Sequence, residues 1–509
     1  MLANVLSYGL SGIDGFPVTV EVNLSGGLPV FELVGLPDAA VRESRERVRA
    51  AMKNSGFGFP DDRLIVNLAP ADMKKEGPAF DLAIAVGVIA SMGLIAPEAL
   101  KDIAILGELS LDGSIRPVRG ALPMTISARE GGLGRIALPE GNAREVACVA
   151  GIGIYPFSSL KHLVAFLRGA LKIAPVEPVE YAKLLGARSS GSDFRYVKGQ
   201  KFAKRALEIA AAGGHNALLI GTPGSGKTLL ARAVPTILPD MSFAEALEAT
   251  RIHSAAGFPP ESGLLTERPF RSPHHTASPA AIVGGGASAL PGEISRAHHG
   301  VLFLDELPEY RRDVLEVLRQ PMEDGVVTIT RVSAQATYPA QFMLVCSMNP
   351  CPCGNYGSRT AQCRCTPHQI RQYLNKISGP LLDRIDLHIE VESIPADELA
   401  SPGAEEESAA VRARVEAART VQRDRFVGQG IACNARLDAR TLGPNCPMTG
   451  EAKRLLRDAS EAMGFSNRAY TRVVKVARTI ADLAGGGEIE QAHIAEAVQY
   501  RALDRKYWG

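Results

Sequence analysis

The sequence predicts an α/β protein of several domains with a doubly wound parallel sheet near its middle. Strands alternate with helices from Phe194 to about Ile394, which is the order that a parallel sheet requires. Three apolar runs in this region are short and bounded by turn or polar residues, as fully buried strands are: Ala217–Ile220, Val301–Leu304 and Phe342–Cys346. The length of 509 residues predicts two to four domains of about 100–200 residues each.

Residues 1–170 are predicted to form a separate α/β domain with an irregular order of elements. Its period-2 and period-3.6 apolar patterns predict strands at Val18–Val22, Leu64–Asn67 and Ile103–Leu106 and helices at Ala39–Lys53 and Phe80–Ala90. Residues 171–193 contain Pro175, Pro178 and a Ser-Ser-Gly-Ser cluster. This composition predicts a linker.

Residues 194–398 are predicted to hold the parallel sheet, and residues 399–509 are predicted to be helical. The segment Ser401-Pro402-Gly403 and the acidic run Glu405–Glu407 mark the change between them. Start and stop signals then predict four helices: Ser408–Arg425, Gly450–Met463, Arg468–Leu483 and Glu490–Ala502.

The composition excludes several classes of protein. Hydrophobic residues at 46% and charged residues at 22% are typical of globular proteins, so collagen-like and disordered chains are excluded. The 56 Lys and Arg residues nearly balance the 55 Asp and Glu residues, which leaves a formal charge of +1. A nucleic acid or other polyanion would therefore have to bind a local basic patch.

No segment is predicted to cross a membrane. The longest apolar run, Leu82–Ala96, is interrupted by Gly87, Ser91 and Gly93 and is shorter than the roughly 20 residues of a membrane span, so a buried helix is expected. The first forty residues contain four acidic residues and no Lys or Arg, the reverse of a signal peptide. We expect a soluble, cytoplasmic protein.

The strongest chemical signal follows the expected strand Ala217–Ile220. The next eight residues match the P-loop pattern and precede a helical run, Leu229–Val234, so the motif has the strand and the helix that it requires. Its glycines let backbone N–H groups surround phosphates at a helix N-terminus, Lys227 supplies charge to the β- and γ-phosphates, and the Thr228 hydroxyl binds Mg²⁺. The predicted phosphate-binding residues are Gly221, Thr222, Pro223, Gly224, Ser225, Gly226, Lys227 and Thr228.

Polar residues also follow the other two expected buried strands. Asp305 would lie at the end of Val301–Leu304, where a nucleotide-bound Mg²⁺ needs a carboxylate, and Glu306 could polarise the attacking water. An acidic pair after a strand is a weak signal alone, but at about 80 residues beyond a P-loop it is predicted to be a Walker B element. Asn349 follows Phe342–Cys346 and could hold the water or the γ-phosphate, although a lone asparagine there is more often a turn residue.

Four of the eight cysteines lie together in a C-x-C-x₉-C-x-C pattern. Eight cysteines in this length do not form a disulfide scaffold, and four thiolates suit a tetrahedral Zn²⁺, although the one-residue separations are tighter than usual. A structural Zn²⁺ in the hairpin 351–365 is expected, the alternative being reduced cysteines in an irregular loop. Arg359 and Arg364 in this hairpin could face DNA or a neighbouring subunit. The predicted ligands are Cys351, Cys353, Cys363 and Cys365.

Beyond these motifs, the chain resembles the YifB/ComM family of magnesium-chelatase-like AAA+ ATPases. The resemblance covers nearly all 509 residues and is more specific than the P-loop and the acidic pair. The segments that carry it are Asn67–Ala71, Lys75–Pro78, Gly199–Gln200, Ala206–Asn216, Arg271–His275, Gly379–Asp386 and Ala477–Leu483.

The resemblance implies roles that spacing alone does not assign. Asn349 resembles sensor 1, Arg384 resembles the arginine finger, and Arg468 resembles sensor 2, with Arg472 as the alternative for sensor 2. Without the resemblance, each arginine would be interpreted as part of a surface ion pair. ATP and Mg²⁺ are the implied cofactors, and a homo-oligomer in the form of a hexameric ring is the implied assembly.

Residues 1–170 resemble the Lon-protease-like (S5-like) fold. Peptidases of that fold use a Ser–Lys dyad with the serine in a Gly-Pro-Ser segment, whereas this chain has Gly77-Pro78-Ala79, and Leu122 falls where the lysine is expected. Because alanine is not a nucleophile, a non-peptidase domain is predicted. Lys74 and Lys75 are then expected to be surface residues or polyanion contacts.

The family resemblance implies a ring motor that couples ATP hydrolysis to DNA translocation and branch migration in natural transformation and recombination. Single-stranded or branched DNA and recombination proteins are the implied partners, and the candidate contacts are the basic helices Arg42–Arg49 and Val411–Arg425 and the segment Arg268–Ser288, with His274 and His275. The alternative is the motor subunit of a magnesium or cobalt chelatase, which needs neither the Lon-like domain nor the Cys hairpin. An ATP-dependent protease is disfavoured by Ala79.

Overall fold

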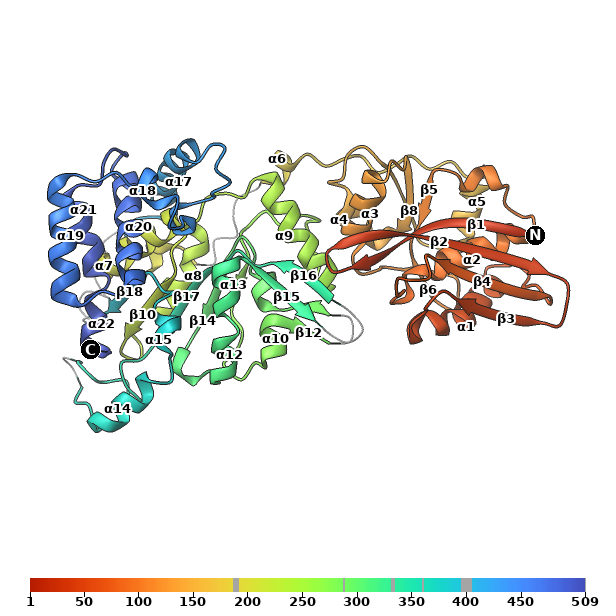
Figure 1. Cartoon of the computed structure of the whole chain (residues 1–509). Coiled ribbons are helices and arrows are strands. Elements are labelled where there is room, and N and C mark those ends of the chain that lie inside the picture. The colour runs from red at the N-terminus through yellow and green to blue at the C-terminus, as the bar shows by residue number, and fades with distance from the viewer. Residues whose placement is uncertain (186–191, 287–288, 331–334, 359–360, 395–404, 509) are drawn as a thin grey trace.

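The computed structural model describes residues 1–185, 192–286, 289–330, 335–358, 361–394 and 405–508. These residues form three parts along an elongated chain, with the N-terminal sheet at one end and a group of helices at the other (Figure 1). The predicted class, α/β with a parallel sheet and a helical C-terminal part, is confirmed. The predicted boundary at residues 398 and 399, with Ser401-Pro402-Gly403, lies outside the described residues, as do residues 186–191 of the predicted linker.

A seven-stranded mixed sheet in the order β3-β4-β2-β1-β5-β8-β9 forms the N-terminal part. Its strands are β1 (Leu2–Ser11), β2 (Asp14–Ser25), β3 (Val30–Val34), β4 (Arg63–Ala69), β5 (Ile103–Ile105), β8 (Arg135–Pro139) and β9 (Gly153–Phe157), and β6 (Glu108–Leu109) and β7 (Ile115–Arg116) form a small hairpin beside it. The helices are α1 (Ala39–Asn54), α2 (Asp81–Ser91), α3 (Ala121–Glu130), α4 (Ala143–Val146), α5 (Leu160–Leu167) and, after the sheet, α6 (Tyr181–Leu184).

Helix α2 is the centre of the N-terminal core. All of its residues are buried, and it packs on β1, β2 and α1. This confirms that the apolar run beginning at Leu82 is a buried helix. Its one charged residue, Asp81, accepts a hydrogen bond from Arg47 Nε at 2.6 Å, and burial raises the pKa of Asp81 to about 6 against the opposing effect of Arg47. Within the described ranges, no helix has both the length and the apolar character that a bilayer crossing requires.

The second sheet consists of five parallel strands in the order β11-β14-β17-β10-β18. Because adjacent strands run in the same direction, the residues that follow β10, β14 and β17 meet at one edge, where ligands bind in open α/β sheets. The strands are β10 (Ala217–Gly221), β11 (Phe270–Arg271), β14 (Val301–Leu304), β17 (Met343–Met348) and β18 (Leu387–Val391). The three predicted strands are therefore present, and β11, with two residues, is too short to be recognised from sequence.

Helices and two hairpins complete the P-loop part. The helices are α7 (Lys201–Gly213), α8 (Lys227–Ile237), α9 (Phe243–Ala256), α10 (Pro279–Val283), α11 (Glu293–Arg296), α12 (Arg312–Glu316), α13 (Arg319–Asp324), α14 (Pro367–Leu374) and α15 (Gly379–Leu382). The hairpins are β12 (Gly284–Gly285) with β13 (Leu290–Pro291), and β15 (Val326–Thr330) with β16 (Gln335–Pro339). Short 3₁₀ helices span Pro78–Phe80, Pro97–Leu100, Glu140–Asn142, Phe194–Tyr196, Leu307–Glu309 and Asn434–Arg436.

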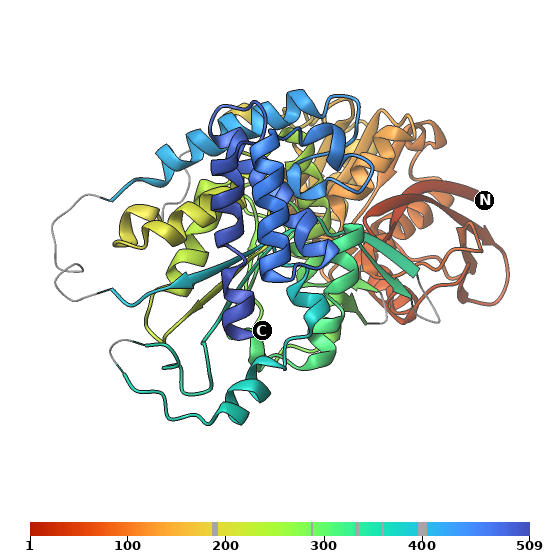
Figure 2. The same ribbon diagram turned by 60° about the vertical axis from the view of Figure 1, so that its left-hand side comes forward.

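The C-terminal helices pack on α7 and α8 of the P-loop part. Figure 2 shows them in blue, side by side at the front of the molecule. An ion pair between partly buried Arg472 and buried Asp386 joins α20 to the loop before β18, because Arg472 Nη1 donates to the carboxylate of Asp386. Burial raises the pKa of Asp386, but the charge of Arg472, together with the His215 ring and the backbone N–H of Asn216, outweighs burial and holds this pKa below its usual range. The helices are α17 (Ser408–Arg425), α18 (Leu442–Asn445), α19 (Gly450–Met463), α20 (Asn467–Leu483), α21 (Gln491–Gln499) and α22 (Ala502–Tyr507).

The N-terminal part is attached to the P-loop part through α9. The backbone N–H of Gly120 donates to Ser254 O at 3.1 Å, and Ser254 Oγ donates to the carboxylate of Glu145. Glu145 is buried, and burial raises its pKa. Leu247 of α9 packs on the apolar cluster between α3 and the N-terminal sheet. The two sheets are thus joined by a packed interface as well as by the chain itself.

Lys75 does not lie where we expect it from the sequence. Its side chain is fully buried, and its Nζ donates to the backbone carbonyls of Pro70 and Met73, the latter at 2.8 Å. Burial lowers the pKa of Lys75. Lys75 therefore holds the loop after β4 and is not a surface or polyanion contact, whereas Lys74 is partly exposed and paired with Glu76 at 2.8 Å.

Candidate nucleotide and metal sites

The P-loop connects the end of β10 to the start of α8. Gly224 and Gly226 have φ values of 78° and 91°, a region in which a side chain adds strain. Lys227 is the first residue of α8, and its Nζ donates to the carbonyl oxygens of Gly221 at 2.7 Å and Thr222 at 2.8 Å. Burial lowers the pKa of Lys227 to about 8. Phosphate oxygens beside this buried ammonium would supply the negative charge that favours its protonated form.

Side chains from the ends of β14 and β17 lie beside the P-loop. Thr228 Oγ1 donates to Asp305 Oδ2 at 2.9 Å, and Lys227 Nζ donates to Asn349 Oδ1 at 3.2 Å. Ser347 Oγ donates to the other oxygen of Asp305. The structure therefore brings together Lys227, Thr228, Asp305 and Asn349. Carboxylate and hydroxyl oxygens such as those of Asp305 and Thr228 are the kind of ligand that Mg²⁺ prefers.

Glu306 lies at the edge of this group. Its backbone is in the left-handed region with φ of 53°, and its N–H donates to Asp305 Oδ1 at 3.0 Å. The carboxylate is more than half exposed and lies 3.6 Å from His275 Nδ1. His275 belongs to the segment Arg268–Ser288, whose last two residues lie outside the described ranges, and its ring packs on His274 with centroids 4.1 Å apart. The structure thus places His275 beside Glu306.

Two neighbours of the P-loop, Ser347 and Gln200, were given no role by the sequence analysis. Ser347 orients Asp305, and its place two residues before Asn349 on a strand tip is the feature that could have identified it. Gln200 Nε2 donates to Ser225 O at 3.2 Å and to Glu392 O at 2.6 Å. Gln200 therefore ties the P-loop to the end of β18, a contact that only the fold reveals.

The three arginines with implied roles lie away from the P-loop. Arg384 is buried, with Nη1 donating to Pro380 O at 2.6 Å and Nη2 paired with Glu323. Burial lowers the pKa of Arg384, and the nearby charge of Arg468 acts in the same direction. Arg468 is exposed near the start of α20, and Arg472 pairs with Asp386. Among the described hydrogen bonds and ion pairs, none joins these arginines to the P-loop.

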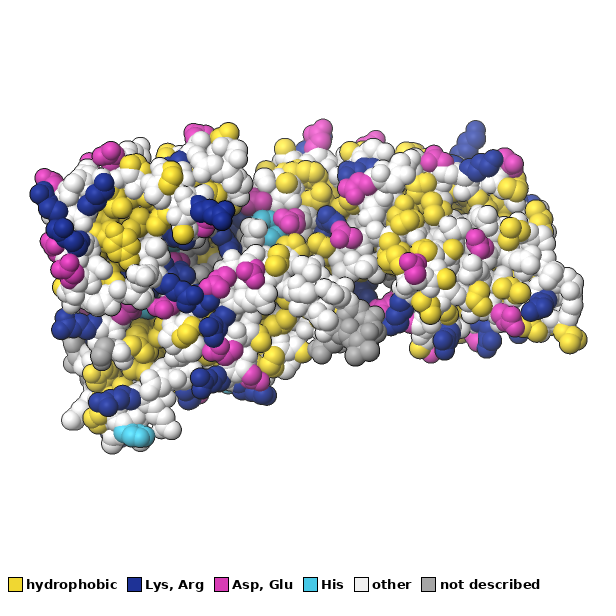
Figure 3. All heavy atoms as spheres, in the orientation of Figure 1, with side chains coloured by type: hydrophobic (Ala, Val, Ile, Leu, Met, Phe, Trp, Pro, Cys, Tyr) yellow, Lys and Arg dark blue, Asp and Glu magenta, His cyan; other side chains and the backbone are white. Residues whose placement is uncertain are grey.

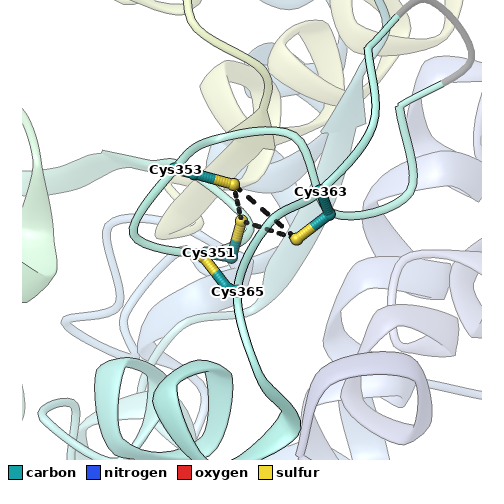
Figure 4. A group of neighbouring side chains, drawn as sticks. All are labelled: Cys351, Cys353, Cys363 and Cys365. Atoms are coloured by element: carbon teal, nitrogen blue, oxygen red, sulfur yellow. Dashed lines mark hydrogen bonds between the residues drawn. The ribbon is translucent and has the colours of Figure 1, made fainter.

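Three sulfurs of the Cys hairpin are separated by distances that suit a metal. The Sγ atoms of Cys351, Cys353 and Cys363 lie 3.4, 3.6 and 3.7 Å apart, and Cys365 Sγ lies within 4.8 Å of them (Figure 4). A tetrahedral Zn²⁺ with Zn–S bonds of about 2.3 Å has sulfurs about 3.8 Å apart. The four thiols therefore fit such an ion. Arg364 is exposed beside them, and Arg359 lies outside the described residues.

A second group, Glu248 with His298 and His299, also brings possible ligand atoms within 4.8 Å. His298 Nδ1 accepts a hydrogen bond from the backbone N–H of Gln341 at 3.0 Å, so the neutral ring carries its proton on Nε2. That nitrogen lies 3.2 Å from a Glu248 carboxylate oxygen but makes no hydrogen bond to it, whereas His299 Nε2 bonds the same oxygen at 2.8 Å. The group is explained as a hydrogen-bonded cluster in which both histidines lower the pKa of Glu248.

Ala79 and Leu122, the residues that stand where the resemblance places the Ser–Lys dyad of the peptidases, have no reactive side chains. Ala79 packs on the apolar cluster that contains Leu122. A cavity of about 380 Å³ beside Gly77, Pro78 and Ala79 is also lined by Leu290 and Tyr338 of the P-loop part. Its described lining contains no serine, threonine, cysteine or lysine.

Comparison with known protein families defines the class of this protein. Residues 193–399 match the model of magnesium chelatase subunit ChlI, residues 20–142 match a second model of the ChlI subunit of Mg-chelatase, and residues 405–501 match the ChlI C-terminal model. The P-loop, the parallel sheet and the C-terminal helices are thus those of a magnesium-chelatase-like AAA+ ATPase.

Individual relatives specify the family further. The YifB protein of Salmonella typhimurium is 44% identical over 505 residues, which cover 99% of this chain and 98% of the relative. The competence protein ComM of Haemophilus influenzae is 43% identical over 507 residues, which cover 99% and 98%. The chain belongs to the YifB/ComM family of magnesium-chelatase-like AAA+ ATPases. A Lon protease of Rhizobium meliloti is 30% identical over 181 residues, which cover 33% of this chain and 22% of that protease.

Proposed function

We propose that this protein is an ATP-driven ring motor that moves along DNA and migrates branched junctions. The observation that carries the motor half is the contact of Lys227, Thr228, Asp305 and Asn349 at one edge of the parallel sheet. In this proposal the P-loop amides and Lys227 bind the phosphates of ATP, and Thr228 and Asp305 hold Mg²⁺.

The remaining catalytic roles follow the positions of the side chains. Glu306 is exposed beside Asp305 and acts as the general base for the attacking water, and Asn349 orients the γ-phosphate or that water from its contact with Lys227. The phosphate-binding set is Gly221, Thr222, Pro223, Gly224, Ser225, Gly226, Lys227 and Thr228.

The DNA half of the proposal is supported by the similarity to a relative named a competence protein. On the face in Figure 3, Lys and Arg side chains gather over the P-loop and helical parts among acidic ones. A ring of near-neutral subunits would grip phosphates through such local groups. We propose single-stranded or branched DNA and recombination proteins as partners, a hexameric ring as the assembly, and the cytoplasm as the location.

The DNA proposal is tested with wild-type protein, ATP and a labelled three- or four-way junction. Strand products are expected, and they should disappear with Glu306→Gln, which keeps the shape of the site. Binding to the same junction should weaken steeply as salt rises, because each phosphate contact releases counterions. Junctions that stay intact while ATP hydrolysis proceeds without DNA would contradict this part of the proposal.

The same preparation distinguishes the alternatives. The three chelatase family models favour a metal-chelatase motor as the second candidate, and it predicts metal insertion into a porphyrin with partner subunits. A peptidase predicts ATP-dependent cleavage of casein. We propose instead that residues 1–170 are a non-peptidase scaffold, since the cavity beside Ala79 offers no nucleophile among its described lining residues, so casein should survive.

We propose that Cys351, Cys353, Cys363 and Cys365 hold one structural Zn²⁺ per chain. The sulfur separations of 3.4–3.7 Å support this. When bound, the ion would link the two ends of a loop that has few apolar residues of its own.

Elemental analysis is expected to find one zinc per chain in the wild type. Cys353→Ser should lower that content, whereas Cys148→Ser, which changes a partly buried thiol of the N-terminal part, should not. Zinc-free protein whose four hairpin thiols are all freely alkylated would refute the site.

A further inference from the structure

The Cys hairpin lies against the P-loop. Gly354 follows Cys353, its N–H donates to Cys351 O at 2.9 Å, and its φ is 81°. A Cβ placed on Gly354 would lie 2.5 Å from Pro223 Cδ and 2.6 Å from Pro223 Cγ. These distances are far below van der Waals contact. The backbone of the hairpin therefore packs directly against Pro223 of the P-loop.

The other end of the hairpin contacts Asn349. Cys365 is followed by α14, which contains the buried Tyr373. The Tyr373 hydroxyl lies close enough to the backbone N–H of Asn349 for that N–H to lower the pKa of the hydroxyl against the larger raising effect of burial. Cys351 is itself fully buried two residues after Asn349. The segment from Asn349 to Tyr373 thus leaves the nucleotide site, passes through all four cysteines and returns to the same asparagine.

We propose that Gly354 and Tyr373 are positioning residues of the nucleotide site, and that metal bound by the four cysteines is coupled to nucleotide bound by the P-loop. The inference rests on the proposed nucleotide and zinc sites. With metal bound, the turn at Gly354 is fixed against Pro223, and Tyr373 fixes Asn349 so that its amide oxygen meets Lys227. Without metal, the four thiols no longer hold the hairpin closed, and both contacts loosen.

Coupling between two binding sites is reciprocal. If Zn²⁺ raises the affinity for nucleotide by some factor, nucleotide must raise the affinity for Zn²⁺ by the same factor. The hairpin touches the P-loop itself, so an effect within the common range of about 5–150-fold is expected.

The first experiment measures both directions of this linkage on the full chain. The affinity for a fluorescent ADP is compared between zinc-loaded and zinc-depleted protein, and Zn²⁺ affinity is compared with and without saturating ADP. Two equal factors of at least about fivefold are expected. Protein that binds both zinc and ADP, with neither affecting the other, would overturn the inference and leave the proposed function intact.

A pair of glycine variants isolates the contact. Gly354→Ala and Gly357→Ala lie in the same hairpin at φ of 81° and 76°, so both add similar backbone strain. Only the first meets Pro223, because a Cβ at Gly357 comes no closer than 4.0 Å to Lys506 Nζ. Gly354→Ala should weaken ADP binding by about tenfold or more at full zinc content, and Gly357→Ala should not. Equal losses in both variants would refute the contact as a positioning device.

Tyr373→Phe tests the second contact, because it removes the hydroxyl that lies beside the backbone N–H of Asn349 and keeps the ring. A lower kcat with unchanged zinc content and little change in ADP affinity is expected, since the proposed partners of Asn349 are the γ-phosphate, which ADP lacks, and the attacking water. Unchanged kcat in this variant would remove Tyr373 from the proposal. Failure of the wild type to bind ADP or zinc at all would instead reject the proposed sites on which the inference depends.

Discussion

Replacement of Lys227 by alanine is expected to abolish ATP binding, whereas Glu306→Gln is expected to bind ATP like the wild type and fail to hydrolyse it. Lys227 is the buried cation among the P-loop carbonyls, so its loss removes charge from the phosphates in every state. Glu306 is exposed, and its amide variant keeps the shape but lacks the base, which is worth about 10²–10⁴ in rate. Fluorescent nucleotide titration and phosphate release measure the two quantities.

The matched control for the lysine variant is Arg232→Ala. Arg232 is an exposed cation on the same helix, α8, so its removal changes the net charge equally and should leave nucleotide affinity unchanged. An equal loss of ATP affinity in the Lys227 and Glu306 variants would contradict the assignment of Glu306 as the base.

Arg384→Ala is expected to slow hydrolysis by roughly 10³-fold or more while ATP still binds. Arg384 has no described contact with its own P-loop, and an arginine that reaches the γ-phosphate of the next subunit is worth about 10³–10⁵ in rate. Head-to-tail contacts that close into a ring supply such a neighbour. Mixing Lys227→Ala with Arg384→Ala subunits should restore part of the activity, because some interfaces then carry both intact residues.

The ion pair between buried Arg384 and exposed Glu323 makes a second variant informative. If Arg384 acts on the γ-phosphate bound to the next subunit, it must leave Glu323 to do so. The pair with Glu323 is then not required for activity, so Glu323→Gln should fold and retain ATP hydrolysis. Verified mixed rings that show no rescue would count against the role between subunits. A Glu323→Gln protein that unfolds would show that the pair is structural.

The sequence predicted the nucleotide site better than its surroundings. The P-loop and the strand after which Asp305 lies have local patterns, and parallel strands bring their ends together without further information. Gln200 and Gly354 reach the P-loop from distant segments, and no local pattern encodes such contacts. The ion-pair partner of Arg384 is Glu323 of α13, and the position of Glu323 beside Arg384 depends on how that helix packs.

The predictions of the fold also succeeded where a local pattern exists and failed where the structure depends on contacts between segments. Helix α2 and the strands β10 and β14 are marked by continuous apolar runs of the expected length, and their bounds agree with the prediction to within one or two residues. The prediction that Lys75 lies at the surface was wrong because a lysine between a second lysine and a glutamate resembles a solvent-exposed charged run. Backbone carbonyls of Pro70 and Met73 receive its ammonium instead, and their position depends on how the loop after β4 folds back.

The interface at α9 between the N-terminal part and the P-loop part limits how the chain can be divided into fragments for experiments. A fragment that begins at residue 194 would retain the whole parallel sheet but would leave the Ser254 hydroxyl without Glu145 and the side chain of Leu247 facing water. A fragment that ends at residue 170 would expose the opposite apolar surface around Leu122. Because newly exposed apolar patches promote aggregation, poor yield of either fragment would reflect the cut surface. Studies of the N-terminal part are therefore better made with point variants in the intact chain.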